Sequence, residues 1–232
     1  LAGSPNEKIT EGLDGLRDRL KEYYNLGAKF TKWRGVYNIS KDFPSKLSIQ
    51  SNAHALARYS ALVQECNMVP IVEPEVLMDG DHDIQKCYEV TSKTLSNLFS
   101  NLKFQNVYLE GILLKPNMVI SGLKCEKQAT VNEVAQMTVE CLKNNVPEEV
   151  PGIVFLSGGQ NDQRATEHLN EINKIQGFSW KLSFSYGRAL QQPVLYKWKG
   201  DDENILEAQK ELLKRSKLNS MATTGKYLLE ME

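Results

Sequence analysis

The sequence alternates between short apolar runs and longer stretches in which apolar positions recur every three or four residues. Short apolar runs bounded by turn residues are typical of buried strands, and strict alternation of apolar and polar positions is typical of half-buried ones. Residues 28–37 alternate, which places Lys32 and Arg34 on one face and Thr31 and Trp33 on the other. We therefore predict strands at residues 28–37, 69–75, 107–115, 152–156 and 180–188.

Amphipathic segments lie around and between these strands, as expected for helices that bury one face. Thr10 is the expected N-cap of the first helix, and Gly27 is expected to end it. Thr130 and Glu133 match a capping box, which predicts a helix start at this point. The predicted helices are residues 11–24, 52–67, 81–102, 130–145, 164–175 and 204–221, and residues 222–232 are predicted to be irregular.

Strands that alternate with helices favour a parallel sheet. Polar or reactive residues lie at or near the carboxyl ends of the predicted strands, and most recur at a nearly constant spacing; they are Lys32, Glu73, Lys115, Ser157 and Tyr186. A (β/α)8 barrel explains this pattern, because the carboxyl ends of its strands converge on one mouth. An open doubly wound sheet is the alternative, but the glycine-rich G-x-G-x-x-G turn typical of that fold is absent.

Lys115 ends the apolar run at residues 107–115, and Pro116 then stops the strand because it has no N–H group to donate. Burial disfavours the charged form of a lysine, and a neutral amine is a nucleophile that forms a Schiff base with a carbonyl. A lysine that extends its amine into solvent from a strand end is the alternative interpretation.

If the other charged residues near the strand ends share one barrel mouth, they can act on the same substrate as Lys115. Lys32 and Arg34 would favour the neutral form of Lys115 and bind anionic oxygens. Glu73 would carry protons to and from a carbinolamine or a leaving hydroxyl, whereas a salt bridge with Lys32 at the barrel rim is the alternative. Glu75 is expected to form ion pairs with the lysines from outside the reacting centre.

Two glycine-bearing segments after the last predicted strands indicate a phosphate site. Glycines leave backbone N–H groups open to an anion, a helix begins soon after the first segment, and an arginine can contact phosphate with two donors. An ordinary strand-to-helix turn that uses glycine for its backbone freedom is the alternative. The residues expected to contact phosphate are Ser157, Gly158, Gly159, Ser185, Gly187 and Arg188.

Composition narrows the class of protein. The chain has 232 residues, is 41% hydrophobic and 25% charged, and carries a formal net charge of −1, so it shows no electrostatic signature of nucleic-acid or anionic-membrane binding. No run reaches the ~18 apolar residues of a membrane span. The four cysteines form no C-x-x-C pair, which argues against a zinc or redox site and favours free thiols in a reducing cytosol.

Five motifs together resemble the class I (Schiff-base) fructose-1,6-bisphosphate aldolases, over essentially all 232 residues. They are Leu-Glu-Gly-Ile-Leu-Leu-Lys-Pro-Asn-Met at 109–118, Val-Pro-Ile-Val-Glu-Pro-Glu at 69–75, Lys-Trp-Arg at 32–34, Phe-Leu-Ser-Gly-Gly-Gln at 155–160 and Ser-Tyr-Gly-Arg-Ala-Leu at 185–190. The resemblance implies that Lys115 forms the Schiff base, that Glu73 is the catalytic glutamate, and that Lys32 and Arg34 act on the substrate. It also implies that the two glycine-bearing segments bind phosphate.

The resemblance implies an activity and a setting. The expected enzyme is a lyase that reversibly cleaves fructose 1,6-bisphosphate to dihydroxyacetone phosphate and glyceraldehyde 3-phosphate in glycolysis and gluconeogenesis, without a metal or other cofactor. The family is typically a cytoplasmic homotetramer, and contacts with cytoskeletal proteins are known for it. A non-catalytic scaffold or protein-binding role is therefore the alternative function.

The resemblance also implies an incomplete barrel. In the family, the strand with Lys-Trp-Arg is the fourth, so residues 1–232 would be the larger, C-terminal part of a single barrel and supply about strands 4–8. We expect the chain to be part of a longer polypeptide, because five strands cannot close an eight-stranded barrel. Residues 222–232 would begin the C-terminal tail, which ends in tyrosine in the family and here reads Leu-Leu-Glu-Met-Glu at 228–232.

Overall fold

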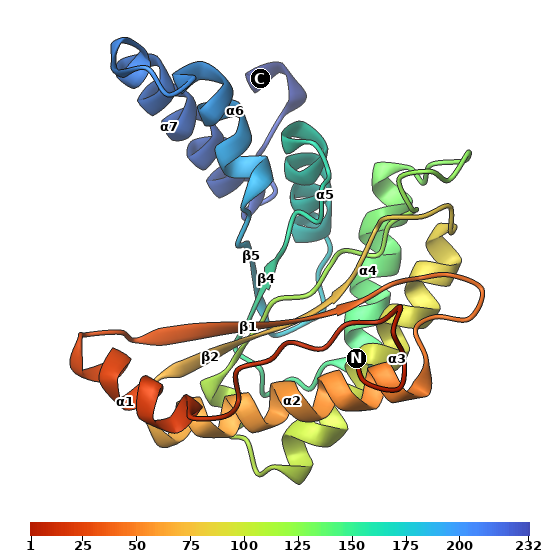
Figure 1. The fold of residues 1–232 in the computed structure, drawn as a ribbon. Coiled ribbons are helices and arrows are strands. Elements are labelled where there is room, and N and C mark those ends of the chain that lie inside the picture. The colour runs from red at the N-terminus through yellow and green to blue at the C-terminus, as the bar shows by residue number, and fades with distance from the viewer.

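The computed structural model describes all residues from Leu1 to Glu232. Its centre is a parallel sheet of five strands in which each strand pairs with the next one along the chain (Figure 1). The strands are β1 (Phe30–Tyr37), β2 (Val69–Val76), β3 (Leu113–Leu114), β4 (Gly152–Phe155) and β5 (Lys181–Phe184). The predicted parallel α/β sheet is confirmed, and its strand order is that of consecutive strands in a (β/α)8 barrel.

Helices follow the strands and cover one face of the sheet. Helix α2 packs on β1 and β2, and α3, α4 and α5 continue the layer, each beside its predecessor (Figure 1). Helices α6 and α7 pack on each other and on α5, and they form a block at the end of this layer. The helices are α1 (Leu16–Asn25), α2 (Lys46–Glu65), α3 (Ile84–Phe104), α4 (Val131–Asn145), α5 (Asp162–Lys174), α6 (Arg188–Trp198) and α7 (Ile205–Ala222), and the 3-10 turns are Leu109–Gly111, Asp202–Asn204 and Leu229–Met231.

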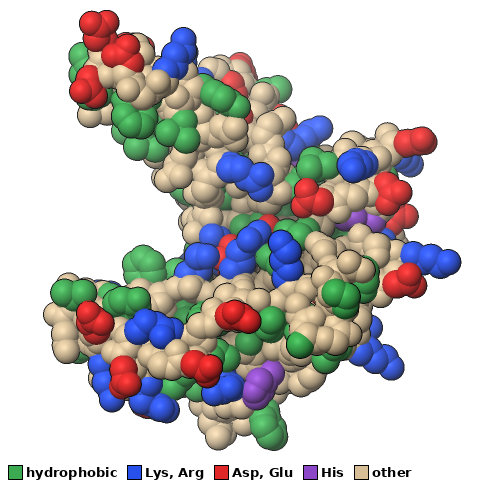
Figure 2. Space-filling model, viewed as in Figure 1, with side chains coloured by type: hydrophobic (Ala, Val, Ile, Leu, Met, Phe, Trp, Pro, Cys, Tyr) green, Lys and Arg blue, Asp and Glu red, His purple; other side chains and the backbone are tan.

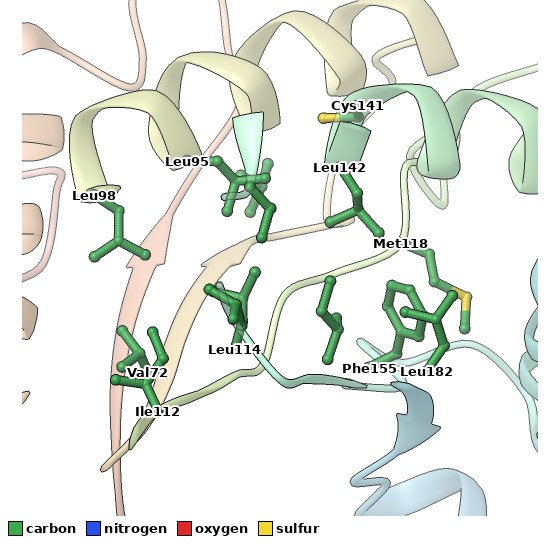
Figure 3. Packing of buried hydrophobic residues seen from close by; sticks show 14 of the residues in the cluster. Val72, Leu95, Leu98, Ile112, Leu114, Met118, Cys141, Leu142, Phe155 and Leu182 are labelled. Atoms are coloured by element: carbon green, nitrogen blue, oxygen red, sulfur yellow. The ribbon is translucent and has the colours of Figure 1, made fainter. Parts of the chain in front are cut away.

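The core lies between the sheet and this helical layer. Val72, Leu114 and Phe155 project from three neighbouring strands toward Leu95 of α3 and Leu142 of α4, and all five are buried (Figure 3). Each such side chain contributes roughly 1.5–3 kcal/mol through removal from water. Because successive strand residues point to opposite faces, this packing directs the residue after Val72 and the residue after Leu114 to the other face. Those two residues are Glu73 and Lys115.

The structure corrects two predictions near the site. The strand predicted at residues 107–115 is wrong for most of its length, since Leu109–Gly111 form a 3-10 turn and only Leu113 and Leu114 pair with neighbours. Thr10 does not cap the first helix. Its hydroxyl instead donates to the carbonyl of Arg34, and α1 begins five residues after the predicted start, behind Gly15. In both segments tertiary contacts replace the structure that local pattern favours.

Helix boundaries follow capping side chains. The capping box of Thr130 and Glu133 is confirmed. Helix α2 begins six residues before its predicted start because the Ser45 hydroxyl accepts from the N–H of Ser48, and α3 begins at Ile84 because Asp83 caps it. Helix α6 was not predicted, and the predicted irregular tail contains the short turn Leu229–Met231.

Candidate active site

Three strands bring two lysines and a glutamate together on the face opposite the core. Oε1 of Glu73 lies 3.2 Å from Nζ of Lys115, and Oε2 of the same carboxylate lies 2.9 Å from Nζ of Lys32. Glu73 is 3% exposed and Lys115 is 9% exposed, whereas Lys32 reaches into solvent. In the space-filling view, Lys and Arg side chains gather with an acidic one along the wall of the hollow between the α6–α7 block and the rest of the molecule (Figure 2).

Strand register explains how these side chains meet. The main-chain N–H of Lys115 donates to the carbonyl of Val72 at 2.8 Å, so the sheet holds this lysine although β3 ends one residue earlier. Lys32 pairs in register with Ile71, yet its amine contacts Glu73, two residues further along β2. Long side chains on β1 therefore lean toward the carboxyl end of the sheet, where barrel enzymes carry their chemistry.

Arg34 and Glu75 form a second ion pair, two residues further toward the carboxyl ends of β1 and β2 than Lys32 and Glu73. Arg34 pairs in register with Glu73, but its Nε donates to the carboxylate of Glu75, again two residues along. The hydrogen bond to Glu75 raises the pKa of Arg34, against the opposing effect of burial. The ion-pairing role expected for Glu75 is present, but its partner is this arginine and not a lysine. Nor do Lys32 and Arg34 end their strand, since β1 continues to Tyr37.

Asn117 fixes the segment that follows Lys115. Its Oδ1 accepts from the N–H of Val76 at 3.0 Å, and its Nδ2 donates to Oγ1 of Thr91 at 3.1 Å. This buried amide thus ties the carboxyl end of β2 and helix α3 to the chain two residues after the lysine. Sequence reasoning missed Asn117, although a single amide within an apolar run is a recognisable signal of a buried hydrogen-bonding role.

The first glycine segment forms a tight turn between β4 and α5. Gly158 and Gly159 have φ values of 61° and 94°, and none of the N–H groups of Ser157, Gly158 and Gly159 donates a hydrogen bond within the protein. A Cβ atom on Gly159 would lie 3.3 Å from Nη2 of Arg188. The structure therefore brings the predicted arginine next to the predicted glycine turn, whose main-chain donors are free.

The second glycine segment leads from β5 into α6. The N–H of Ser185 donates to the carbonyl of Phe155, and Gly187 precedes the first residue of α6 with a φ of −93°. Arg188 therefore lies at a helix N-terminus, where positive partial charge favours anions. Tyr186 does not reach the site, because its buried hydroxyl donates to the carbonyl of Ala165 in α5.

Two further findings describe the whole chain. No group of three or more His, Cys, Asp or Glu side chains has an arrangement that could hold a metal ion. None of the helices combines the length and the apolar character needed to span a membrane.

Comparisons with known proteins agree on one family. A family model described as fructose-bisphosphate aldolase class-I matches residues 1–232. A protein of Xanthomonas campestris named "Probable fructose-bisphosphate aldolase class 1" is 59% identical over 98% of this chain and 68% of its own length. "Fructose-bisphosphate aldolase 4, cytosolic" of Arabidopsis thaliana is 51% identical over 98% of this chain and 58% of its own length.

A solved structure agrees in fold as well as in sequence. It is the fructose-bisphosphate aldolase of Plasmodium falciparum in complex with TRAP and a small molecule inhibitor, and it matches with a TM-score of 0.96 and 49% identity. The match covers 98% of this chain and 66% of that one. The chain thus spans between 58% and 68% of the lengths of these three proteins.

Proposed function

Because this chain belongs to the class I fructose-bisphosphate aldolase family, a family of lyases, we propose that Lys115, Glu73 and Lys32 carry the aldol cleavage. The reaction is the reversible cleavage of fructose 1,6-bisphosphate to dihydroxyacetone phosphate and glyceraldehyde 3-phosphate. It takes place in the polypeptide that contains this chain. The observation that carries the assignment is the buried carboxylate of Glu73 between the amines of Lys115 and Lys32.

Lys115 begins the reaction as a nucleophile. Glu73 takes a proton from the Lys115 ammonium, the neutral Nζ attacks the C2 carbonyl of the sugar, Glu73 gives that proton to the carbonyl oxygen, and a carbinolamine forms. Glu73, 3.2 Å from this nitrogen, takes a proton from the amine and returns one to the departing hydroxyl, which leaves as water. The product is a protonated imine between Lys115 and C2, and the ion pair of Glu73 with Lys32 holds the carboxylate in place for both transfers.

The protonated imine then serves as the electron acceptor for carbon–carbon bond cleavage. The C4 hydroxyl gives its proton to the Glu73 carboxylate, the C3–C4 electron pair moves toward the iminium, and glyceraldehyde 3-phosphate leaves. The resulting enamine is protonated at C3, and water hydrolyses the imine to release dihydroxyacetone phosphate and free Lys115. Covalent attachment divides one difficult step into several easier ones.

Phosphate contacts orient the substrate for this attack. Strand β4 is the neighbour of β3, so the turn at Ser157, Gly158 and Gly159 lies close to the end of the strand that Lys115 follows. The carbon that reacts with Lys115 is C2, and its neighbour C1 carries a phosphate. This phosphate binds at the turn and is contacted by Arg188. Ser185 and Gly187 complete this phosphate site, and Arg34 binds oxygens of the substrate from β1.

A rim salt bridge is the competing account of Glu73. A salt bridge of that kind would be solvent-exposed and would join two groups, and exposed pairs contribute only ~0–1 kcal/mol. Glu73 is instead buried and faces two cations, one of which is buried as well. Such an arrangement is costly to form and is typical of a site whose chemistry requires it.

Replacement of Lys115 by methionine tests the nucleophile. In the full-length polypeptide, Lys115→Met should abolish turnover while the circular dichroism spectrum stays that of the wild type. Lys103→Met, which changes an exposed lysine near the end of α3, is the matched control and should leave turnover unchanged. Retained turnover in Lys115→Met refutes the assignment of the nucleophile.

The setting of the enzyme is part of the same proposal. The chain forms the larger part of a single barrel, and residues 222–232 begin its tail. The enzyme acts in the cytoplasm as a homotetramer, and cytoskeletal proteins are its candidate partners. Sedimentation of the purified full-length protein tests the assembly, since a monomer would contradict the tetramer directly.

A further inference from the structure

A histidine outside the proposed chemistry is linked to the phosphate turn. His168 lies on α5, is 4% exposed, and has its Nδ1 2.6 Å from Oε1 of Gln160. Gln160 immediately follows Gly159 and is also buried. Neither residue touches Lys115 or Glu73 in the ion pairs described above.

The chemistry of this contact determines which imidazole nitrogen carries the hydrogen. An amide oxygen can only accept a hydrogen bond, so Nδ1 must carry the hydrogen. Burial, assisted by the charge of Arg164, lowers the pKa of His168 to about 3. The ring is therefore neutral near pH 7 and has one N–H group, which points at Gln160. The other nitrogen, Nε2, is buried without a partner.

This histidine in turn fixes the orientation of the Gln160 amide. Because the Gln160 oxygen faces His168, its amino group faces the other way, and Nε2 donates to the carbonyl of Ser157 at 3.1 Å. The backbone N–H of Gln160 donates to the same carbonyl at 3.0 Å. One carbonyl at the start of the glycine turn thus accepts two hydrogen bonds from the residue at its end.

The turn needs such support because glycine residues restrict the backbone conformation very little. Gly158 and Gly159 both have positive φ, and many other backbone conformations are open to two consecutive glycines. The proposed function requires the free N–H groups of this turn to point at one phosphate. The two bonds to the Ser157 carbonyl hold its ends together and leave the N–H groups of the glycines uncommitted.

We propose that His168 and Gln160 are positioning residues that hold the Ser157–Gly159 turn in its phosphate-binding conformation. The inference rests on the proposed phosphate site. It adds that the affinity of this site for phosphate depends on a neutral, Nδ1-protonated histidine buried in α5. A merely structural role would tie α5 to the sheet without favouring phosphorylated over unphosphorylated substrate.

Two amide replacements of His168 separate these roles. The amide nitrogen of an asparagine lies near the position of Nδ1, and that of a glutamine lies near the position of Nε2. His168→Asn should therefore keep the bond to Gln160, and His168→Gln should lose it. Gln160→Met has similar length and removes both the acceptor and the donor. All variants are made in the full-length polypeptide.

The readout compares two ligands that react with the same lysine. Dihydroxyacetone phosphate and dihydroxyacetone are each titrated, and borohydride reduction traps the Schiff base. We expect His168→Gln and Gln160→Met to raise the half-saturating concentration of the phosphate ligand about 10-fold, equivalent to about 1.4 kcal/mol. The value for dihydroxyacetone should not change, and His168→Asn should stay within about 3-fold of wild type for both ligands.

Several results would overturn the inference, and they are distinct from failure of the proposed function. If the variants weaken the binding of both ligands equally, or leave the binding of both unchanged, His168 and Gln160 do not position the phosphate site. If the wild type shows no preference for the phosphorylated ligand, the phosphate site itself is wrong and the inference falls with it. Nuclear magnetic resonance of ¹⁵N-histidine-labelled wild type decides the matter even if a variant fails to fold, because an Nε2-protonated His168 contradicts the inference.

Discussion

The Nζ atom of Lys115 lies 3.2 Å from Oε1 of Glu73, and both side chains are buried on the same face of the sheet. At this distance a proton can pass between the amine and the carboxylate without an intervening water. The sheet fixes the distance, because the N–H of Lys115 donates to Val72, the residue before Glu73. Glu73 is therefore expected to act on the steps in which nitrogen or oxygen gains or loses a proton.

Replacement of Glu73 by glutamine keeps the shape of the side chain and removes its ability to exchange protons. We expect Glu73→Gln to slow Schiff-base formation by roughly 10²-fold, the lower end of the range for general acid–base catalysis. Substrate binding should change far less. Rapid-quench borohydride trapping measures the first quantity and equilibrium binding measures the second.

The matched control for that change is Glu65→Gln, which alters an exposed carboxylate paired with Arg17. It should leave both the rate of Schiff-base formation and the affinity for substrate at the wild-type level. An unaltered rate of Schiff-base formation in Glu73→Gln would instead favour the rim salt bridge as the role of Glu73.

The pair of Arg34 and Glu75 is expected to stabilise the strand pairing that carries the site. Loss of a buried ion-pair partner costs about 3–5 kcal/mol, but Arg34 is about half exposed and solvent reduces this value. We expect Glu75→Gln to lower the free energy of unfolding by about 1–2 kcal/mol. A double-mutant cycle with Arg34→Met, followed by urea unfolding, should give a coupling energy of about 1 kcal/mol. Strict additivity of the two changes would show that the pair contributes nothing.

A methyl group on Gly159 should weaken phosphate binding. Gly159 has a φ of 94°, and the added Cβ would lie 3.3 Å from Nη2 of Arg188. Gly159→Ala is expected to lower stability by roughly 1–2 kcal/mol, the cost of a left-handed non-glycine residue, and to raise KM about 10-fold. Steady-state kinetics with fructose 1,6-bisphosphate measures the KM.

Gly200→Ala is the control for the backbone cost alone. Gly200 has a φ of 75°, and no atom lies within 4 Å of its added Cβ. It should show a similar loss of stability with an unchanged KM. If both variants changed KM alike, the contact between Gly159 and Arg188 would not matter for binding.

The titration of His168 should make the free energy of unfolding depend on pH. Its pKa is about 3 in the folded protein and ~6.5 in an unfolded chain, so the unfolded state takes up the proton first as pH falls. Stability from the neutral ring is present above pH ~6.5 and is lost as pH falls toward 3, by up to about 1.4 kcal/mol per pH unit.

His168→Asn isolates this contribution, because asparagine does not titrate. The difference in unfolding free energy between wild type and variant should become steadily less favourable to the wild type from pH 6.5 to pH 4.5. Urea unfolding at several pH values measures it. A difference that stays constant over this range would contradict a buried neutral histidine.

The fold was predictable where local pattern and tertiary structure agree. The apolar run before Glu73 and the capping box at Thr130 both specify their elements without help from distant residues. Residues 107–115 were not predictable, since Gly111 and Leu109 belong to a turn although the run is as apolar as a strand. Helix α6 begins directly after Gly187, which has no capping side chain, and it contains Pro193, a residue that normally interrupts helices, so the sequence gives no signal of a helix here.

At the candidate site, the sequence pattern predicts which side chains share a face of the sheet but not which contacts they make. Alternation along β1 and β2 placed Lys32, Arg34, Glu73 and Glu75 on one face. It could not show that each cation reaches two residues along the neighbouring strand, because register depends on how whole strands pack. Asn117, Gln160 and His168 were missed for a related reason, since their roles arise from contacts between distant elements.

If Lys115 is the amine that forms the Schiff base, borohydride reduction of the full-length polypeptide in the presence of dihydroxyacetone phosphate should label this lysine. Mass-spectrometric mapping of the labelled lysine should then find one covalent adduct per polypeptide, at Lys115, and none in Lys115→Met. An adduct at Lys32 or at another lysine, or no adduct at all, would contradict this assignment.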